Sequence, residues 1–219
     1  MIASELISQD LIPLKTSDTG RAALAVMADF YVKHLPIVNN TQLLGVVSEE
    51  DIINNPIDED VGSYTLSQVK PYVNHKEHLF EIMRTMAEND LTVVPVVDDD
   101  GNYMGLITQN DLLQFYARSF SFTEPGGILV LEMAKSDYLL SEIARIIEDE
   151  NTVVLSSFIT SGAGSNLVYL TLKLNRSNLE EVVASLRRYG YNIKGSFVEA
   201  EYYDQLKDRY DMLMNYLDV

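Results

Sequence analysis

The sequence predicts a mixed α/β (α+β) protein built from two βαββα repeats, a βαββαβ domain and a final helix. Three observations support this fold class. A pattern of strands and helices recurs after about 60 residues in the first half of the chain, and it stops near residue 120, where a different order begins. The chain has 219 residues, of which 47% are hydrophobic, and this is enough for two domains with separate cores.

The composition excludes several functional classes. The 33 acidic residues outnumber the 16 Lys and Arg, so the net charge is −17 and the chain repels nucleic-acid backbones and anionic membranes. Cysteine is absent, which excludes disulfides, thiolate metal sites and Cys nucleophiles. No apolar run approaches the ~18 residues of a membrane span, and residues 1–10 lack the pattern of a secretory signal. We therefore expect a cytoplasmic protein that binds neither nucleic acid nor membrane directly.

The repeat is visible as two matched stretches of sequence. Residues 34–38 match residues 93–97 at an offset of 59. Residues 45–52 match residues 105–112 at an offset of 60. The extra residue lies between the two stretches, where Asn, Asp and Gly are typical of a hairpin turn. A turn tolerates such a change of length, so the two units are expected to share one fold.

Each repeat also has a helix before its first matched stretch. Apolar residues recur at helical spacing over residues 22–31 and again over residues 79–87. Asn74 and Glu77 have the spacing of an N-cap and its partner, which predicts the start of the second helix. Each repeat therefore reads as a short strand, a helix, a strand hairpin and a final helix.

Both repeats contain a Pro-Ile/Val-Val strand and a second strand that ends in Gly-apolar-apolar-Ser/Thr-x-x-Asp. This combination, present twice in register, resembles the cystathionine-beta-synthase (CBS) domain, which normally occurs as a tandem pair. The resemblance covers about residues 1–120, with repeats at about 1–58 and 59–120. It implies an adenine nucleotide or adenosyl compound (AMP, ATP or similar) as a possible regulatory ligand, with no cofactor required.

A new pattern follows a boundary at residues 123–127. Its order, βαββαβ, is that of the ferredoxin-like split sandwich. In a chain that carries a CBS pair, this order over residues 121–200 looks like an ACT domain, and the layout is similar to the acetoin-utilisation regulatory protein family. The predicted elements are a strand at 128–133, a helix at 139–147, strands at 153–160 and 167–174, a helix opened by a Ser177–Glu180 capping box, and a strand at 193–198.

The last segment, residues 201–219, is predicted to form an amphipathic helix. Its apolar stripe has two interpretations, docking onto its own domain or contact with a second copy in a homodimer. The stripe, with steps of three and four, consists of Tyr203, Leu206, Tyr210, Leu213 and Leu217.

Two Ser/Thr-x-x-Asp pairs are the first candidates for a ligand site. Ser48 with Asp51, and Thr108 with Asp111, lie where a strand ends and a helix begins. One interpretation is helix capping alone. The CBS resemblance implies instead that they hold the ribose and phosphate of an adenine nucleotide. The base would then lie against strand residues whose other interpretation is simply core: Ile37, Val38, Val96 and Val97.

The charged residues near the expected phosphate position have opposite effects on phosphate binding. Basic residues before the Pro-containing strand reach phosphates in several CBS modules, and here Lys33 and His34 occupy that position in the first copy only. The residue before the Asp is Glu50 in the first copy, which would repel an anion, and Asn110 in the second. With few cations available, we expect AMP or a similar ligand ahead of a triphosphate. Lys33 as an ordinary solvated residue is the alternative.

No other pattern predicts a site. We expect no metal and no catalytic residue, because the acidic turn at 98–101 has the wrong spacing for a calcium loop and no nucleophile motif is present. The loop at 134–138 lacks the Gly that amino-acid-binding ACT domains usually have there. The leading hypothesis is a non-enzymatic regulatory protein that binds an adenine nucleotide and acts through the ACT-like domain or an unidentified protein target. The alternatives are a structural homodimeric adaptor with empty clefts and an amino-acid sensor.

Overall fold

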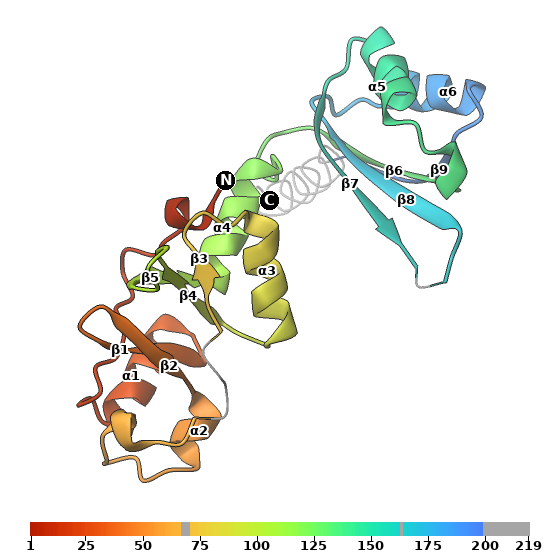
Figure 1. Cartoon of the computed structure of the whole chain (residues 1–219). Coiled ribbons are helices and arrows are strands. Elements are labelled where there is room, and N and C mark those ends of the chain that lie inside the picture. Colours follow the sequence, from red (N-terminus) through yellow and green to blue (C-terminus); the bar gives the residue numbers. More distant parts are fainter. Residues whose placement is uncertain (67–70, 163, 199–219) are drawn as a thin grey trace, which may run out of the picture. The chain divides into compact units, whose positions relative to one another are not determined.

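The computed structural model describes residues 1–66, 71–162 and 164–198, and the chain divides into two compact units, Met1–Phe115 and Tyr116–Val219 (Figure 1). The helix predicted at residues 201–219 lies outside the described residues.

The first unit contains both copies of the predicted repeat. Each copy has a helix, an antiparallel strand pair and a closing helix. The first copy consists of α1 (Gly20–Phe30), β1 (His34–Asn39), β2 (Gln42–Ser48) and α2 (Glu49–Ile53). The second consists of β3 (Val73–Asn74), α3 (Leu79–Glu88), β4 (Val93–Val97), β5 (Tyr103–Thr108) and α4 (Gln109–Ser119), and 3-10 turns lie at Ala3–Glu5 and Val61–Ser63.

The strand registers repeat as closely as the sequence does. Pro36 pairs with Val46 in the first hairpin, and Pro95 pairs with Leu106 in the second. Both hairpins shift register one step after the proline, between Ile37 and Val38 and at the matching place in the second copy. The predicted leading strand is present as β3 in the second copy, parallel to β4, but is reduced to a single parallel bridge between Leu14 and Ile37 in the first.

The predicted start of the second helix is wrong. Helix α3 begins at Leu79, and its N-cap is His78, whose side chain accepts a hydrogen bond from the Phe80 N–H at 3.3 Å. Asn74 lies in β3, and its side-chain oxygen accepts from the Lys76 N–H at 3.0 Å. Asn74 therefore closes a local turn, which is the usual competitor of a helix cap for Asn side chains.

The two repeats exchange their leading segments. The start of the first repeat bonds to the second, with Ala3 N–H donating to the Glu77 carbonyl at 2.9 Å and Ser8 N–H to the Leu106 carbonyl at 2.8 Å. The start of the second repeat bonds to the first in the same manner, with Val61 N–H donating to the Asp18 carbonyl at 2.8 Å. Neither repeat completes its own hydrogen bonding, so the pair is one folding unit.

The core of the first unit is also shared. One cluster of buried side chains contains Leu35 and Val47 of the first copy together with Val93 and Leu106 of the second. At about 25 cal/mol per Å² of apolar surface, burial of these side chains is the main favourable term that holds the repeats together.

A small polar network joins the repeats at equivalent positions. The Lys33 N–H donates to Thr92 Oγ1 at 2.8 Å, and the Thr92 N–H donates to His34 Nδ1 at 3.2 Å. The Thr92 hydroxyl also lies 3.1 Å from His34 Nδ1. Because Nδ1 accepts from the Thr92 backbone, His34 is neutral with its proton on Nε2.

The second unit forms a four-stranded antiparallel sheet in the order β7-β8-β6-β9. The element order βαββαβ is the predicted one. The Ser177–Glu180 capping box is wrong, because α6 has Leu179 at its N-cap without a side-chain bond and Asn178 accepts from the Glu180 N–H instead. The elements are β6 (Gly127–Ala134), α5 (Leu140–Asp149), β7 (Val154–Ser161), β8 (Leu167–Leu174), α6 (Glu180–Arg188) and β9 (Asn192–Val198), with a 3-10 turn at Lys135–Asp137.

Both helices of the second unit cover the same face of its sheet (Figure 1). Strand β6 alternates buried and partly exposed residues along its whole length, which is typical of a sheet with one covered face. The buried face contributes Leu129 and Leu131, which pack with Ile143 and Ile146 of α5 and Val182 of α6. The second unit therefore has its own core.

We predict that acid destabilises the protein through His34. Burial lowers the pKa of His34, reinforced by the charge of Lys33, although Asp90 and Asp51 oppose the shift. The unfolded chain protonates this ring near its ordinary pKa of 6.5, whereas the folded chain keeps it neutral to lower pH. The contribution of His34 to the free energy of unfolding is therefore fully present above about pH 6.5 and is lost as the pH falls below it.

The variant His34→Asn tests whether His34 causes the loss of stability in acid, because the Asn oxygen keeps an acceptor near the Nδ1 position and does not titrate. The urea midpoint of the unchanged protein should fall more between about pH 7.5 and about pH 5 than that of the variant. Equal falls in the two proteins would contradict the prediction.

Candidate functional site

The Ser/Thr-x-x-Asp pair of the first copy forms a capping box at the start of α2. Ser48 Oγ accepts from the Asp51 N–H at 3.0 Å. Asp51 Oδ2 accepts from the Ser48 N–H at 3.0 Å and from the Ser48 hydroxyl at 2.8 Å. The Asp51 side chain is buried, with 5% of its surface exposed. The capping interpretation is therefore confirmed for this pair.

The second copy repeats this geometry in a more open setting. Thr108 Oγ1 accepts from the Asp111 N–H at 3.0 Å, and Asp111 Oδ2 accepts from the Thr108 N–H at 2.9 Å and the hydroxyl at 2.7 Å. Asp111 is only partly buried. It also opens the longer helix, since α4 has 11 residues and α2 has 5. The positive end of a helix dipole is thus better developed beside Asp111.

A cleft in the first unit lies next to this second pair. Its volume is about 240 Å³. The second copy contributes Thr92 and residues 108–110, and the first copy contributes residues 30–32 at the end of α1. None of the described residues that line the cleft is charged. The lining consists of Phe30, Tyr31, Val32, Thr92, Thr108, Gln109 and Asn110.

The end of α1 brings Tyr31 to this cleft. Tyr31 closes the helix in the left-handed conformation, with φ at 54°. The following residue completes the helix end, because the Val32 N–H donates to the Met27 carbonyl at 2.9 Å. Asp90, the matching residue of the second copy, is also left-handed, with φ at 51°. The backbone at this position is therefore a property of the repeat, whereas the tyrosine belongs to one copy.

The two basic residues expected at the phosphates lie outside the set that lines the cleft. His34 is 8% exposed, and its Nδ1 is occupied by Thr92. Burial lowers its pKa, so the ring is an acceptor rather than a cation. Lys33 is exposed, with its backbone N–H bonded to Thr92 and its carbonyl accepting from the Glu49 N–H at 2.9 Å.

The four strand residues expected to contact a base are buried. Ile37 belongs to the shared core of the first unit. Val38 and Val97 pack together in a smaller cluster with Leu43, and Val96 is fully buried. Their core interpretation is therefore observed, and the sequence analysis missed Phe30, Tyr31, Val32, Thr92 and Gln109 as cleft residues.

A signal for the missed residues was present in the repeat. At the offset of 59, Lys33 matches Thr92 and Tyr31 matches Asp90. One copy has a cation or an aromatic residue at these positions, and the other has a small polar or acidic residue. Such differences between matched positions indicate where the two copies differ in chemistry.

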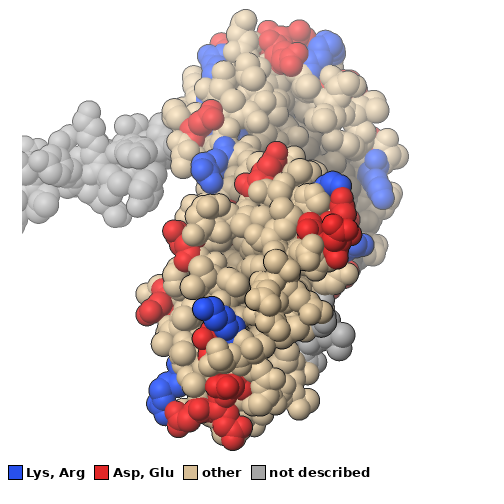
Figure 2. Space-filling view, turned by 60° about the vertical axis from the view of Figure 1, so that its left-hand side comes forward, with Lys and Arg blue, Asp and Glu red and all other residues tan. Residues whose placement is uncertain are grey.

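The molecular surface carries charges of both signs. Acidic and basic side chains are interspersed on the face shown in Figure 2, with acidic groups the more prominent. Glu50, just after the Ser48 cap, is exposed. A highly charged anion is disfavoured by the net charge of −17.

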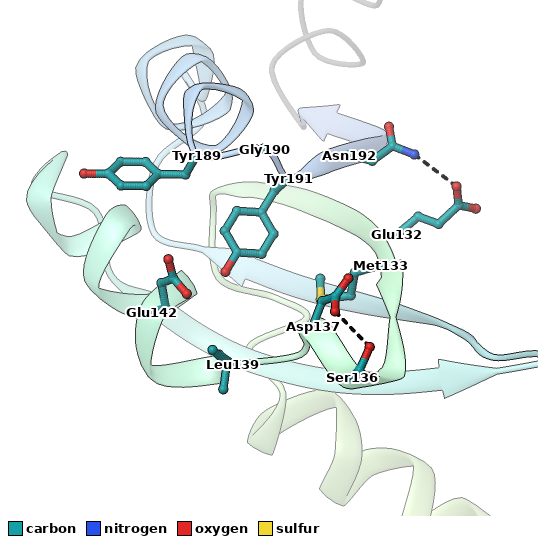
Figure 3. Close-up of a pocket in the computed structure, with 10 residues that line it drawn as sticks. All are labelled: Glu132, Met133, Ser136, Asp137, Leu139, Glu142, Tyr189, Gly190, Tyr191 and Asn192. Carbon is teal, nitrogen blue, oxygen red and sulfur yellow. Dashed lines mark hydrogen bonds between the residues drawn. The ribbon is translucent and has the colours of Figure 1, made fainter.

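The second unit has a larger pocket, of about 550 Å³, between the start of α5 and the loop that joins α6 to β9 (Figure 3). Glu132 at its edge accepts from Asn192 Nδ2 at 3.0 Å and Lys194 Nζ at 3.1 Å. Hydrogen bonding to Lys194 and Tyr169 lowers the pKa of Glu132. Burial, then the charge of Glu142, raises the pKa of Tyr191.

The lining of this pocket is acidic and aromatic. Its charged side chains are all carboxylates among the residues that the structure describes. The lining residues are Glu132, Met133, Ser136, Asp137, Leu139, Glu142, Tyr189, Gly190, Tyr191 and Asn192. A pocket therefore exists although the loop at 134–138 has no Gly.

Residues 1–66, 71–162 and 164–198 contain neither a cluster of metal ligands nor a membrane-spanning helix. No three His, Asp or Glu side chains in these ranges come together as metal ligands. No helix there is long and apolar enough to cross a membrane.

Solved structures and curated proteins match between about half and about two thirds of the chain. An inosine-5'-monophosphate dehydrogenase of Methanocaldococcus jannaschii is 26% identical over 151 residues, which cover 68% of this chain and 30% of that protein. A CBS domain pair/ACT domain protein of Thermotoga maritima is 21% identical with a TM-score of 0.48, over 54% of this chain and 98% of that one. CBSX2 in complex with AMP is 24% identical with a TM-score of 0.44, over 53% and 96%.

The chain spans only about a third of the length of the first curated relatives that it matches. The family model for the CBS domain, in contrast, matches the chain twice, over residues 3–58 and 61–118. These matches coincide with the two copies of the repeat and cover more than half of the 219 residues. The chain therefore belongs to the CBS domain family, as a tandem pair.

Proposed function

We propose that this protein is a non-enzymatic regulator whose CBS pair binds an adenine nucleotide, AMP or a similar ligand, in the cleft beside Thr108. The observation that carries the proposal is the cleft itself, which both repeats build next to the Asp111 carboxylate. A solved structure of another CBS protein, CBSX2, is a complex with AMP, and this supports the same ligand class here.

The geometry near Asp111 suits a ribose. An ionised carboxylate has about four acceptor positions, and Thr108 occupies two of those on Asp111. The remaining capacity is available to ribose hydroxyls. The Asn110 side chain can donate to a phosphate near the start of α4, where the helix dipole favours an anion.

The neutral lining favours a ligand of low charge. Each unpaired phosphate charge would have to be held by dipoles and solvent, because the described residues that line the cleft include no cation. A monophosphate or an adenosyl compound fits this better than a triphosphate. Capping by Asp111 is compatible with ligand binding, since the two roles use different acceptor positions.

We predict that Asp111→Asn weakens AMP binding by about 10- to 100-fold, because a hydrogen bond to a charged acceptor contributes ~1.5–3 kcal/mol. The Asn oxygen still accepts from the Thr108 N–H, which protects the helix start. Asp51→Asn is the matched variant in the first copy, where the carboxylate is buried, and its effect should be smaller. Calorimetry on both variants distinguishes ligand binding from helix capping alone. Unchanged AMP affinity in both variants would leave capping as the only function of Asp111 and Asp51.

We propose that the second unit is a ferredoxin-like, ACT-type domain and that the layout is that of the acetoin-utilisation regulatory proteins. The sheet order β7-β8-β6-β9 and the two helices on one face support this assignment. Ligand binding regulates by favouring one arrangement of the chain over another, and the change passes to this unit or to a protein target.

We further propose a homodimer formed through the helices of the CBS pair. Ile53 of α2 and Leu113 of α4 occupy the same repeat position, and they are 65% and 63% exposed. A repeat that presents an exposed aliphatic side chain at the same position in both copies supplies a self-complementary surface, which a two-fold dimer requires.

The double change Ile53→Gln with Leu113→Gln should convert the dimer to a monomer in light scattering. Ile12→Gln, at a residue that is 73% exposed elsewhere in the first unit, is the control and should leave the dimer intact. A monomer in the unchanged protein at all concentrations would refute the proposal.

A second candidate function is amino-acid sensing by the second unit, which its pocket of about 550 Å³ favours. The carboxylates of the lining provide acceptors for an ammonium group, whereas the described lining residues include no Lys or Arg to hold a carboxylate. We therefore expect a basic amino acid ahead of an acidic one.

A thermal-shift panel of amino acids tests this function, because a ligand at ~100 times its Kd adds ~2.7 kcal/mol to the free energy of unfolding. Glu142→Gln, in the pocket, should reduce the shift given by basic amino acids. Glu148→Gln removes an equal charge from the exposed side of the same helix and should not. No shift with any amino acid would remove this candidate.

A further inference from the structure

We propose that Tyr31 is the platform on which the base of the bound nucleotide stacks, and that this tyrosine restricts base recognition to one of the two CBS clefts. The inference rests on the proposed nucleotide binding and adds the residue that reads the base. It starts from a conflict between the side chain and its backbone.

The left-handed backbone at Tyr31 disfavours tyrosine. Its φ of 54° lies in the region that Gly, Asn and Asp adopt most readily. Cβ crowds the following carbonyl there, Gly has no Cβ, and Asn and Asp offset the cost by local hydrogen bonds that tyrosine cannot make. The helix end itself needs only the backbone, through the Val32 N–H bond to the Met27 carbonyl. Glycine would serve this position better.

The tyrosine side chain makes no contact within the described part of the chain that would offset this backbone strain. It is 94% exposed, so almost none of its ring is removed from water. No ring stacking or hydrogen bond joins it to another described residue. A strained residue without a structural benefit, placed at a cleft, indicates a role toward a ligand.

The position of Tyr31 fits that role. It lines the cleft together with Phe30 on one side and Thr108 and Asn110 on the other. The ribose end of a nucleotide is proposed at Asp111, next to Thr108, so the base extends toward the end of α1. An aromatic ring there offers a flat apolar surface to a purine.

The matching position of the second copy has no aromatic side chain. At the repeat offset of 59, Phe30 corresponds to Asn89 and Tyr31 to Asp90. Asp90 keeps the left-handed backbone, with φ at 51°, but has no ring on which a base can stack. The side of the unit near Ser48 therefore lacks the aromatic pair, and we expect one AMP per chain.

The test compares three ligands with four proteins by calorimetry. The ligands are AMP, adenosine and ribose 5-phosphate, which separate the base from the phosphate end. The proteins are the unchanged chain, Tyr31→Gly, Tyr31→Phe and Asp90→Gly, the last of which relieves the same backbone at the position without a ring.

We expect Tyr31→Gly to raise the melting temperature. It should weaken the binding of AMP and adenosine about tenfold and leave the binding of ribose 5-phosphate unchanged. Tyr31→Phe should bind as the unchanged protein does. Asp90→Gly should also raise the melting temperature while AMP affinity and the stoichiometry of one stay the same.

Two results separate this inference from the function on which it rests. AMP binding that is equally tight in Tyr31→Gly, or an equal loss for ribose 5-phosphate, would overturn the stacking role and leave the proposed function standing. Absence of AMP binding to the unchanged protein would overturn both.

Discussion

The first unit depends on the exchange between its two repeats. Each repeat lacks partners for some of its own backbone groups, and the leading segment of the other repeat supplies them, as Ala3 does at Glu77 and Val61 does at Asp18. Buried side chains of both copies also share one core, so each repeat relies on its neighbour for stability. The cleft is a result of this arrangement, because its walls come from both copies and exist only when the copies are joined.

The same arrangement explains why the two copies differ while the fold stays symmetric. Backbone features recur at equivalent positions, including the bulge after the proline, the capping box and the left-handed helix end. These features are set by local sequence and by the geometry of the pair. The side chains at these positions are free of that constraint. Tyr31 and Thr92 line the cleft, whereas their counterparts Asp90 and Lys33 do not, so the two copies have diverged there.

Much of the fold follows from the sequence, whereas the site follows only in part. The hairpins at Pro36 and Pro95 were predictable because proline, glycine and turn residues act locally. The helix start at His78 was not, because Asn74 can cap a helix or close a turn and the neighbouring strand decides which. The cleft wall at Phe30 was read as part of an apolar helix stripe, since periodicity alone cannot tell a core side chain from one that faces a ligand.

The exchange of leading segments also determines the order in which the first unit can fold during translation. Residues 2–8 make their backbone bonds to residues between His75 and Leu106, so they wait for most of the second repeat to leave the ribosome. The first repeat is thus unfinished while the ribosome adds about 100 residues, at roughly 5–20 residues per second. Closing so long a loop late makes this the slow, non-local step of folding for the first unit. A nascent chain that stalls before Leu106 would lack the partner of the Ser8 N–H and part of the shared core, and the apolar surface that such an intermediate exposes favours aggregation and chaperone binding.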